Sequence, residues 1–332
     1  MPGTGSRAPA GRGTAGPSPG RPADAESARR QDARRSRALG KFGEADCSGP
    51  LPLESEGLTV AYGDSPPLLE NVDFLAWPGE ILGILGPSGC GKSSLLRHLV
   101  GLNWPRTGRV RLFGEDIFAG GERSLDRARH RFGIMYQGGA LFGNMNLIEN
   151  VQMPLREFTS LPPAALEAAA ALKLELVELA GFERYMPSEI SGGMRKRAAI
   201  ARAMALDPGL IFLDEPSAGL DPVTAASLDE LIMTLSKNLR ITFVVVTHEL
   251  RSIMRAVDWA ILLDKRLKGI AAEGSPRYLA EESDSPEARR FFLRAGDPGE
   301  RDGPGAAALD GGPPGPAVGD GAGKAPEPDG KS

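Results

Sequence analysis

Apolar positions in this chain fall into short runs and helical periods between residues 51 and 296, with no internal repeat. Eight apolar or alternating runs predict β-strands, at 58–62, 72–77, 81–85, 109–113, 133–136, 210–213, 242–247 and 260–263. Helical spacing predicts α-helices after Lys92, over 164–180, after Gly193, over 223–236 and after His248. Runs such as LIFLDE are apolar on both faces, as in buried parallel strands. The pattern predicts an α/β domain with a mostly helical insertion over about 144–208.

Two flanking segments lack the apolar residues of a core. Residues 1–50 are rich in Gly, Pro, Ala and Arg, and their nine basic minus five acidic residues give +4. Residues 297–332 are rich in Gly and Pro, and their three basic minus seven acidic residues give −4. Such compositions predict disordered tails. The alternative is that the basic arm touches anionic lipid headgroups or the acidic tail.

Composition excludes several classes of protein. The chain of 332 residues is 41% hydrophobic and 25% charged, which suits a folded domain. A net charge of −4 argues against a nucleic-acid-binding protein. Cys47 and Cys90 cannot form a disulfide framework or a zinc site, which suits a reducing compartment. No apolar run approaches the roughly 18 residues of a membrane span, and no signal peptide is evident.

The stretch GPSGCGKSS lies between the apolar run EILGIL and the helical stretch KSSLLRHLVGL. It fits G-x-x-x-x-G-K-[ST], in which backbone N–H groups surround the phosphates of a nucleotide. We expect Lys92 to place its charge on the phosphates and the Ser93 hydroxyl to bind Mg²⁺. The residues expected to contact the nucleotide are Gly86, Pro87, Ser88, Gly89, Cys90, Gly91, Lys92, Ser93 and Ser94.

Polar residues end three of the predicted strands. Asp214 and Glu215 follow a buried run, where carboxylates are costly unless a cation or proton satisfies them. We expect Asp214 to hold Mg²⁺ through water and Glu215 to activate the attacking water as general base. A lone histidine is more often structural, but His248 ends the next strand at the same edge, which favours a contact with the γ-phosphate. Gln137 ends a short strand, where its amide can orient a water or bind the metal.

The stretch EISGGMRKRAAIARA presents a helix that begins with Ser-Gly-Gly and carries cations on its positive end. Ser191 is a candidate N-cap. Behind it Met194, Ala198, Ala201 and Ala205 form a small-residue face that predicts core packing. Because Arg195, Lys196 and Arg197 have no nearby acid, we expect an anion to bind here. The P-loop already holds its own nucleotide from one side, so this anion is expected to belong to the nucleotide of a second copy.

Taken together, these motifs stand in the order typical of the ATP-binding cassette (ABC) family, which residues 55–296 resemble. The resemblance implies a P-loop NTPase with a RecA-like core, an antiparallel β subdomain and an inserted α-helical subdomain. It identifies Tyr62 as the aromatic that stacks on adenine. It also implies a head-to-tail homodimer, in which Ser191, Gly192 and Gly193 contact the γ-phosphate bound by the partner copy. Asp221, in SAGLD, would lie across the same interface.

Two stretches are similar to cassettes of Mla/Mce-type phospholipid transporters: YQGGALFGNMNLIENVQMPLREFTSLP and EGSPRYLAEESDSPEARRFFLRAG. Met194, in place of the Gln of the usual LSGGQ, fits that group. This resemblance implies an ATPase that powers phospholipid movement between inner and outer membranes, on the cytoplasmic face of the inner membrane. The implied partners are an MlaE-like permease, docked near Ala140, Leu141 and Phe142, and an Mce-domain protein.

Two other functions are open at this stage. One is an ABC ATPase for another cargo, such as an amino acid or an osmolyte. The other is a non-transport ABC ATPase that acts on DNA or ribosomes. The single cassette, the helical insertion of ordinary length and the absence of cysteine clusters argue against the second function.

Overall fold

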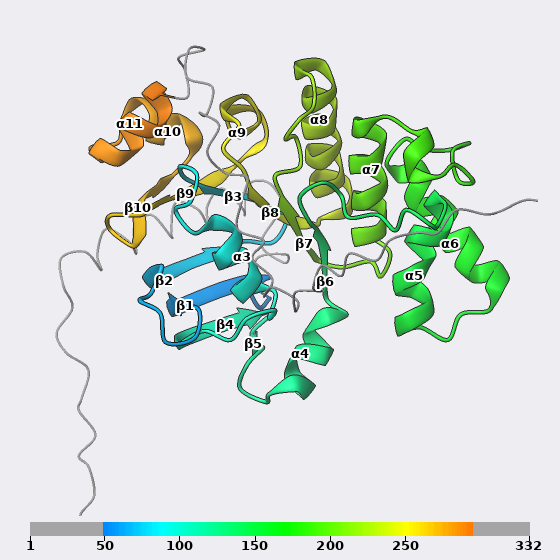
Figure 1. Cartoon of the computed structure of the whole chain (residues 1–332), viewed down its shortest axis with the longest axis horizontal. Helices are drawn as coiled ribbons and strands as arrows, with labels where there is room; N and C mark the ends of the chain where they lie inside the picture. The colour runs from blue at the N-terminus through cyan, green and yellow to red at the C-terminus, as the bar shows by residue number, and fades with distance from the viewer. Residues whose placement is uncertain (1–48, 295–332) are drawn as a thin grey trace, which may run out of the picture. The chain divides into compact units, whose positions relative to one another are not determined.

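Two β-sheets lie at the centre of the computed structural model, which describes residues 49–294 (Figure 1). The first sheet is antiparallel with strand order β2-β1-β4-β5. Its strands are β1 (Leu53–Val60), β2 (Leu69–Ala76), β4 (Thr107–Leu112) and β5 (Glu115–Asp116). The second sheet has the order β10-β9-β3-β8-β7-β6 and is parallel except for the β10 edge. Its strands are β3 (Ile81–Leu85), β6 (Phe132–Met135), β7 (Leu210–Asp214), β8 (Thr242–Val246), β9 (Trp259–Asp264) and β10 (Gly269–Gly274).

The parallel sheet is covered on both faces, as the apolar runs predict. All residues of β3, β7 and β8 are buried. Alternate residues of one strand belong to different cores: Ile211 and Leu213 to one, Leu210 and Phe212 to the other. Because both faces are dry, polar groups of this sheet can reach solvent only at the strand ends, where the loops begin.

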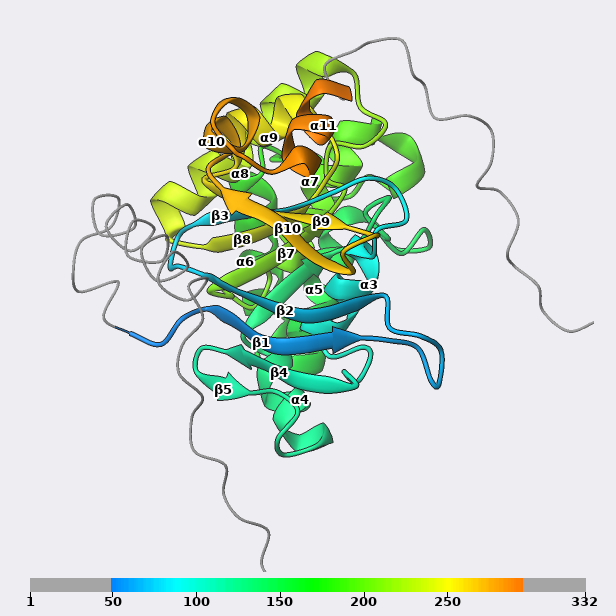
Figure 2. The same ribbon diagram turned by 90° about the vertical axis from the view of Figure 1, so that its left-hand side faces the viewer.

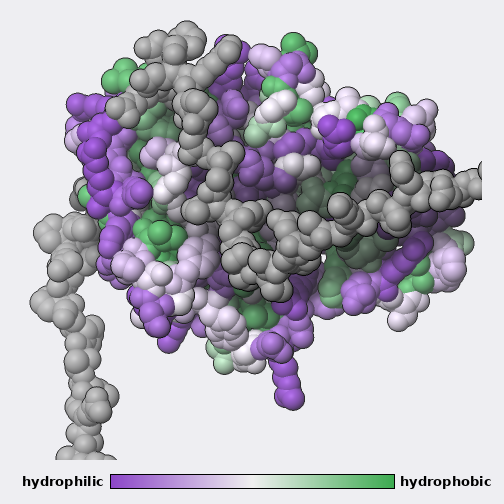
Figure 3. Space-filling view, viewed as in Figure 1, coloured by the Kyte–Doolittle hydropathy of each residue, from purple (hydrophilic) through white to green (hydrophobic). Residues whose placement is uncertain are grey.

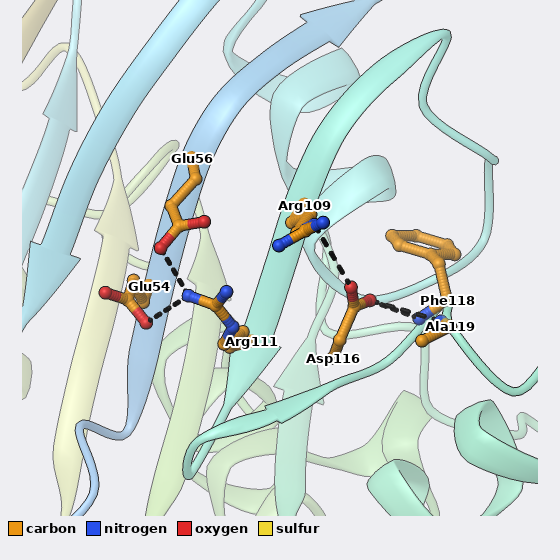
Figure 4. A network of polar contacts seen from close by, with 7 residues as sticks. All are labelled: Glu54, Glu56, Arg109, Arg111, Asp116, Phe118 and Ala119. Atoms are coloured by element: carbon orange, nitrogen blue, oxygen red, sulfur yellow. Dashed lines mark hydrogen bonds and ion pairs between the residues drawn. The ribbon is translucent and has the colours of Figure 1, made fainter. Parts of the chain in front are cut away.

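The antiparallel sheet carries charged residues on its outer face (Figure 4). Arg111 of β4 forms ion pairs with Glu56 and, at 3.1 Å, with Glu54 of β1. Asp116 of β5 lies 4.0 Å from Arg109 and accepts hydrogen bonds from the next loop. Exposed pairs of this kind add little stability. These ion pairs therefore contribute more to which strands pair than to the stability of the sheet.

Most helices pack around the parallel sheet. They are α3 (Lys92–Leu99), α4 (Glu122–Arg129), α8 (Pro222–Leu239), α9 (Leu250–Ala256), α10 (Pro276–Glu281) and α11 (Pro286–Arg294). The predicted insertion consists of α5 (Leu147–Phe158), α6 (Pro163–Leu176), a short 3-10 turn and α7 (Gly192–Ala203). Figure 1 shows α5 and α6 together beyond α7, and Figure 2 shows the two sheets as separate layers. Among residues 49–294, none of the helices combines the length and apolarity needed to cross a bilayer.

The eight predicted strands all exist, and the antiparallel β subdomain and inserted helical subdomain are confirmed. The sequence pattern does not predict β5 and β10, which are short or rich in Gly and Ala, or α4, in which only Ser124, Leu125 and Ala128 are buried. It does not predict the short helices α10 and α11 either. It also began β1 five residues late, because polar Glu54 and Glu56 obscure the period of that strand. Both predicted tails lie outside the described residues.

Candidate functional site

Residues 86–91 form a tight loop between β3 and α3. Gly86 has φ +148, and a Cβ there would lie 2.6 Å from Cys90 Sγ and 2.7 Å from the Leu263 carbonyl oxygen. No other residue fits without displacing β9. Gly91 caps α3 in a left-handed conformation, so the chain turns directly from the loop into the helix. The predicted P-loop therefore has its strand–loop–helix context.

The polar groups of the loop divide into inward and outward sets. Lys92 is buried, and its Nζ donates to the carbonyl oxygens of Gly86 (2.8 Å) and Pro87 (3.2 Å), which holds the charge inside the loop. Ser93 is exposed at the start of α3. The Cys90 thiol is buried in the core and burial raises its pKa, while its amide donates to Pro87. The buried Cys90 side chain thus anchors the loop to the core.

The strand register brings the other candidates to the same edge of the sheet as this loop. Met135 pairs with Leu213 in β7, Asp214 with Val246 in β8, and Ile84 of β3 also with Val246. The residues that follow these positions are Gln137, Glu215, His248 and Gly86. The parallel strands therefore deliver all four predicted elements to one edge, as expected from their positions after the apolar runs.

Glu215 and His248 form a hydrogen-bonded pair at this edge. His248 Nδ1 lies 2.7 Å from Glu215 Oε1, and this bond is the main cause that raises the pKa of His248. The other carboxylate oxygen of Glu215, Oε2, is buried and has no hydrogen-bond partner among the described residues. Glu215 also has φ +49, a strained value for a side-chain-bearing residue. One oxygen is therefore fixed by the imidazole and the other is available to a water.

Asp214 is buried next to this pair. Burial, followed by the charge of Glu215, raises the pKa of Asp214, while Lys92 and Lys196 act in the opposite direction. Its Oδ1 is buried without a partner in the described part of the chain. A buried carboxylate oxygen without a partner, at the sheet edge that the P-loop also reaches, is the kind of oxygen donor that Mg²⁺ prefers. The residues therefore fit a magnesium ion held by Ser93, Asp214 and the Gln137 amide.

Gln137 is exposed, and no hydrogen bond to its side chain occurs within residues 49–294. The residues that follow, Gly138, Gly139 and Ala140, all have positive φ values of 79°, 84° and 47°. The chain thus makes an irregular turn after β6, and Gln137 at its start is exposed rather than packed in the core.

Ser191 caps α7, as predicted. Its Oγ accepts a hydrogen bond from the Met194 amide at 3.2 Å, and its carbonyl oxygen accepts one from the Arg195 amide. The amides of Gly192 and Gly193 make no such bond within the described chain, so they remain available to an anion. Gly193 also packs closely on α8, because a Cβ there would lie 2.4 Å from Thr224 Cγ2.

The cations of the first turn all have protein partners, although the Arg195 guanidinium stays beside the glycine turn: a Cβ at Gly192 would lie 3.9 Å from Arg195 Nη2. Arg195 donates to the carbonyl oxygens of Pro187 and Ile190, at 3.4 and 3.2 Å. The remaining two also donate to protein acceptors: Lys196 to the Glu215 carbonyl oxygen at 3.1 Å, and Arg197 to Val177, Ser227 and Glu178. Burial lowers the pKa of Lys196. The three cations follow the start of α7 in the sequence. In the folded chain each of them donates hydrogen bonds to other protein groups.

Asp221 caps α8, where its carboxylate accepts hydrogen bonds from the amides of Val223 and Thr224, both at 3.1 Å. The hydrogen bond with Thr224 is the first cause that lowers the pKa of Asp221. Within the described chain, no hydrogen bond or ion pair joins Ser191 or Asp221 to the P-loop or the acid pair. The structure thus gathers one half of the predicted site and leaves the other half on the N-termini of α7 and α8.

Tyr62 is 40% exposed, and its hydroxyl donates to Ser94 Oγ at 3.0 Å. Its ring meets the edge of His98, whose Nδ1 lies 2.7 Å from the Ser94 carbonyl oxygen. No role for His98 is predictable from the sequence, because a histidine inside a helix carries no signal of its own. Burial on α3 next to Tyr62 makes it a support for that ring.

Comparison with known proteins adds independent evidence. The family model described as "ABC transporter" matches residues 69–218. The chain is 43% identical over 226 residues to the "Intermembrane phospholipid transport system ATP-binding protein MlaF" of Escherichia coli K12, covering 68% of this chain and 82% of the relative. It is 41% identical over 244 residues to the "Probable ribonucleotide transport ATP-binding protein mkl" of Mycobacterium leprae, covering 73% and 69%.

Solved structures give the same result for the fold. A dimeric post-hydrolysis structure of the ATP-binding cassette MJ0796 bound to ADP and Pi has a TM-score of 0.61 at 28% identity, covering 67% of this chain and 98% of that chain. The structure of cbiO1 from Clostridium perfringens, part of the transporter complex cbiONQ, has a TM-score of 0.65 at 25% identity, covering 74% and 96%.

Proposed function

Because this chain belongs to the ABC transporter ATP-binding family, we propose that its ATPase activity powers phospholipid movement between two membranes through a separate permease. The pairing of Glu215 with His248 beside the P-loop carries the hydrolytic part of this proposal. The relative that transports phospholipid supports the cargo. The two stretches that resemble Mla/Mce-type cassettes, YQGGALFGNMNLIENVQMPLREFTSLP and EGSPRYLAEESDSPEARRFFLRAG, support the same cargo.

The arrangement of side chains supports a sequence of roles in hydrolysis. ATP binds with its phosphates on the amides of the P-loop, and Lys92 exchanges its carbonyl partners for phosphate oxygens. Mg²⁺, held by Ser93, Asp214 and Gln137, would neutralise charge on the phosphates. Glu215 accepts the proton of the attacking water through its free oxygen, and His248 orients the carboxylate and contacts the γ-phosphate.

We further propose that two copies close on two nucleotides, with Gly192 and Gly193 of one copy at the γ-phosphate of the other. The amides of these glycines are available, and the related cassette MJ0796 forms dimers. Asp221 lies at the start of α8 next to them. The permease would dock near Ala140, Leu141 and Phe142 on the cytoplasmic side of the inner membrane, and an Mce-domain protein would complete the complex.

Replacing Glu215 with Gln tests the hydrolytic assignment. The amide keeps the shape of the side chain but cannot accept the proton of water, so steady-state ATP hydrolysis by the purified chain should fall about 100-fold or more. ATP should remain bound, as measured by retention of radiolabelled nucleotide on a desalting column. Normal turnover by this variant would show that Glu215 is not the general base.

The cargo has a second candidate, because a relative at 41% identity is named as a ribonucleotide transport protein. Co-purification with an MlaE-like permease, followed by reconstitution in liposomes, separates the two. Phospholipid transport predicts that acceptor vesicles receive labelled phosphatidylglycerol only when ATP is present. Stimulation of ATP hydrolysis by ribonucleotides, without lipid transfer, would favour the second cargo.

A further inference from the structure

The loop after β6, residues 137–142, is held in place by groups outside itself. Gly138, Gly139 and Ala140 all have positive φ, so this stretch forms neither a helix nor a strand. Backbone carbonyls in such a stretch need partners from elsewhere when they are not fully solvated. The position of Gln137, at the start of the loop, therefore depends on these outside partners.

Arg202, in the last turn of α7, supplies two of the partners. Its Nη1 donates to the Ala140 carbonyl oxygen at 2.8 Å, and its Nη2 donates to the Gly139 carbonyl oxygen at 3.0 Å. The guanidinium carbon lies 5.7 Å from the centroid of the Phe142 ring. Only a planar fork of donors can span two successive carbonyls in this way, whereas a lysine presents a single point charge.

The same side of α7 makes the packing contact. A Cβ at Gly139 would lie 3.3 Å from Ala199 Cβ and 3.5 Å from the Arg195 carbonyl oxygen. Residues 195, 199 and 202 are spaced by four and three, so they share one face of the helix. The loop thus lies directly on α7 along the face that ends at Arg202.

Asn150 of α5 holds the far end of the loop. Its Oδ1 accepts from the Phe142 amide at 2.8 Å, and its Nδ2 donates to the Phe142 carbonyl oxygen at 3.1 Å. Asn150 is fully buried. The loop is therefore attached to two helices of the inserted subdomain, and Gln137 at its start is exposed after β6.

We propose that Arg202 is a positioning residue that ties Gln137 to α7, so that movement of α7 moves Gln137; this rests on the proposed roles of Gln137 and of the Ser191 turn. The N-terminus of α7 carries Gly192 and Gly193, and Arg202 lies roughly 15 Å from Gly192 along the same helix at 1.5 Å per residue. A phosphate that docks on one end of α7 then shifts Gln137 at the other end.

The first test is Arg202→Lys in the full chain. The lysine keeps the charge but cannot hold both carbonyls, so Gln137 should be slightly misplaced. Small misplacements of catalytic groups slow chemistry strongly, so kcat should fall about tenfold or more. The Mg²⁺ concentration for half-maximal hydrolysis should rise, while the Kd for ATP measured with EDTA should not change. Arg197→Lys is the matched control: Arg197 is also on α7 and donates to Val177 and Ser227, but not to the loop. It should keep its kcat.

A double-mutant cycle with Gln137→Ala decides whether Arg202 acts through Gln137. If it does, the double variant should be no slower than Gln137→Ala alone. Losses that multiply, or a normal kcat in Arg202→Lys, would overturn the inference while leaving the function of Gln137 intact. A normal kcat in Gln137→Ala would instead remove the proposed role of Gln137, and the inference with it. If Arg202→Lys does not fold, Phe142→Leu replaces it, because this change removes the ring beneath the guanidinium. Its kcat should fall less than that of Arg202→Lys. The fall should again disappear in a Gln137→Ala background.

Discussion

His248 Nδ1 lies 2.7 Å from Glu215 Oε1, although the two residues are 33 positions apart in the chain. The pairing exists because β7 and β8 are neighbours in the sheet and run parallel, so their carboxyl ends coincide. Without His248, Glu215 would be a carboxylate on a strained stretch of backbone with no partner to orient it. With the imidazole bonded to one oxygen, the carboxylate is oriented, and its second oxygen is left for chemistry.

This pair should make the stability of the protein depend on pH. Glu215 raises the native pKa of His248 above its ordinary value of 6.5. The native state then binds the proton more tightly than the unfolded chain, so this stabilisation is complete below about pH 6.5 and is lost as pH rises through the native pKa. The difference in Tm between the wild type and His248→Gln should therefore be larger at about pH 5.5 than at about pH 9.

The Glu215→Gln background provides the control for this pH dependence. Without the carboxylate, burial and the charge of Lys92 act to lower the pKa of His248, so the difference caused by His248→Gln should no longer be larger at about pH 5.5 than at about pH 9. A difference between wild type and His248→Gln that stays constant across this range would mean that the pair is not charged in the folded protein.

Asp214→Asn should stabilise the nucleotide-free protein. Burial raises the native pKa of Asp214 above 3.8, so the wild type loses stability as pH rises through that native pKa. Removing the buried charge should restore about 1 kcal/mol, or about 2–4 °C in Tm, at about pH 7.5. In the wild type, ATP with Mg²⁺ should raise Tm more than ATP with EDTA does. This difference should disappear in Asp214→Asn, because a carboxylate that binds the ion is gone.

Asp229→Asn is the matched control for this prediction. Asp229, on α8, is also a buried carboxylate whose pKa is raised by burial, but Arg255 and Ser252 face it instead of the P-loop. This variant should keep the full effect of Mg²⁺ on Tm. If Asp214→Asn also keeps it, Asp214 does not hold the metal.

Gly192→Asp should separate dimer closure from folding. A Cβ at Gly192 would lie 3.6 Å from Leu220 and 3.9 Å from Arg195 Nη2, both ordinary contact distances, so the side chain has room. An acid at a helix N-terminus usually stabilises the helix by about 0.3–1 kcal/mol, so the Tm of the free chain should not fall. The same charge would repel a γ-phosphate. In a Glu215→Gln background, the ATP-dependent dimer seen by light scattering should therefore disappear.

The neighbouring glycine gives the contrasting result. Gly193→Ala should lower stability by about 1–3 kcal/mol, because its Cβ would meet Thr224 Cγ2 at 2.4 Å. Combining it with Thr224→Ser removes that methyl group and should recover most of the loss.

An unchanged dimer in Gly192→Asp would show that the glycine turn does not receive a phosphate from the partner copy.

The local chemistry of the site was predictable from sequence, because its signals are local. A glycine pattern between a strand and a helix indicates a P-loop, and Ser191 before a helix indicates a cap. The structure confirms the strand–loop–helix arrangement and the cap. Polar residues after buried runs reach one edge of a parallel sheet whatever the order of the strands. The order itself, with β3 between β9 and β8, was not predictable, because it depends on contacts between distant segments.

The sequence by itself determined where the phosphate loop, the acid pair and the cap lie, because periods of 2 and 3.6 and glycine geometry are properties of neighbouring residues. Only the tertiary structure decided the partners of long side chains. Lys196 donates to the Glu215 carbonyl oxygen and Arg202 to the loop after β6, 19 and 62–63 positions away. Such partners depend on which surfaces pack together, since a flexible cation carries no local signal of the acceptor it will meet.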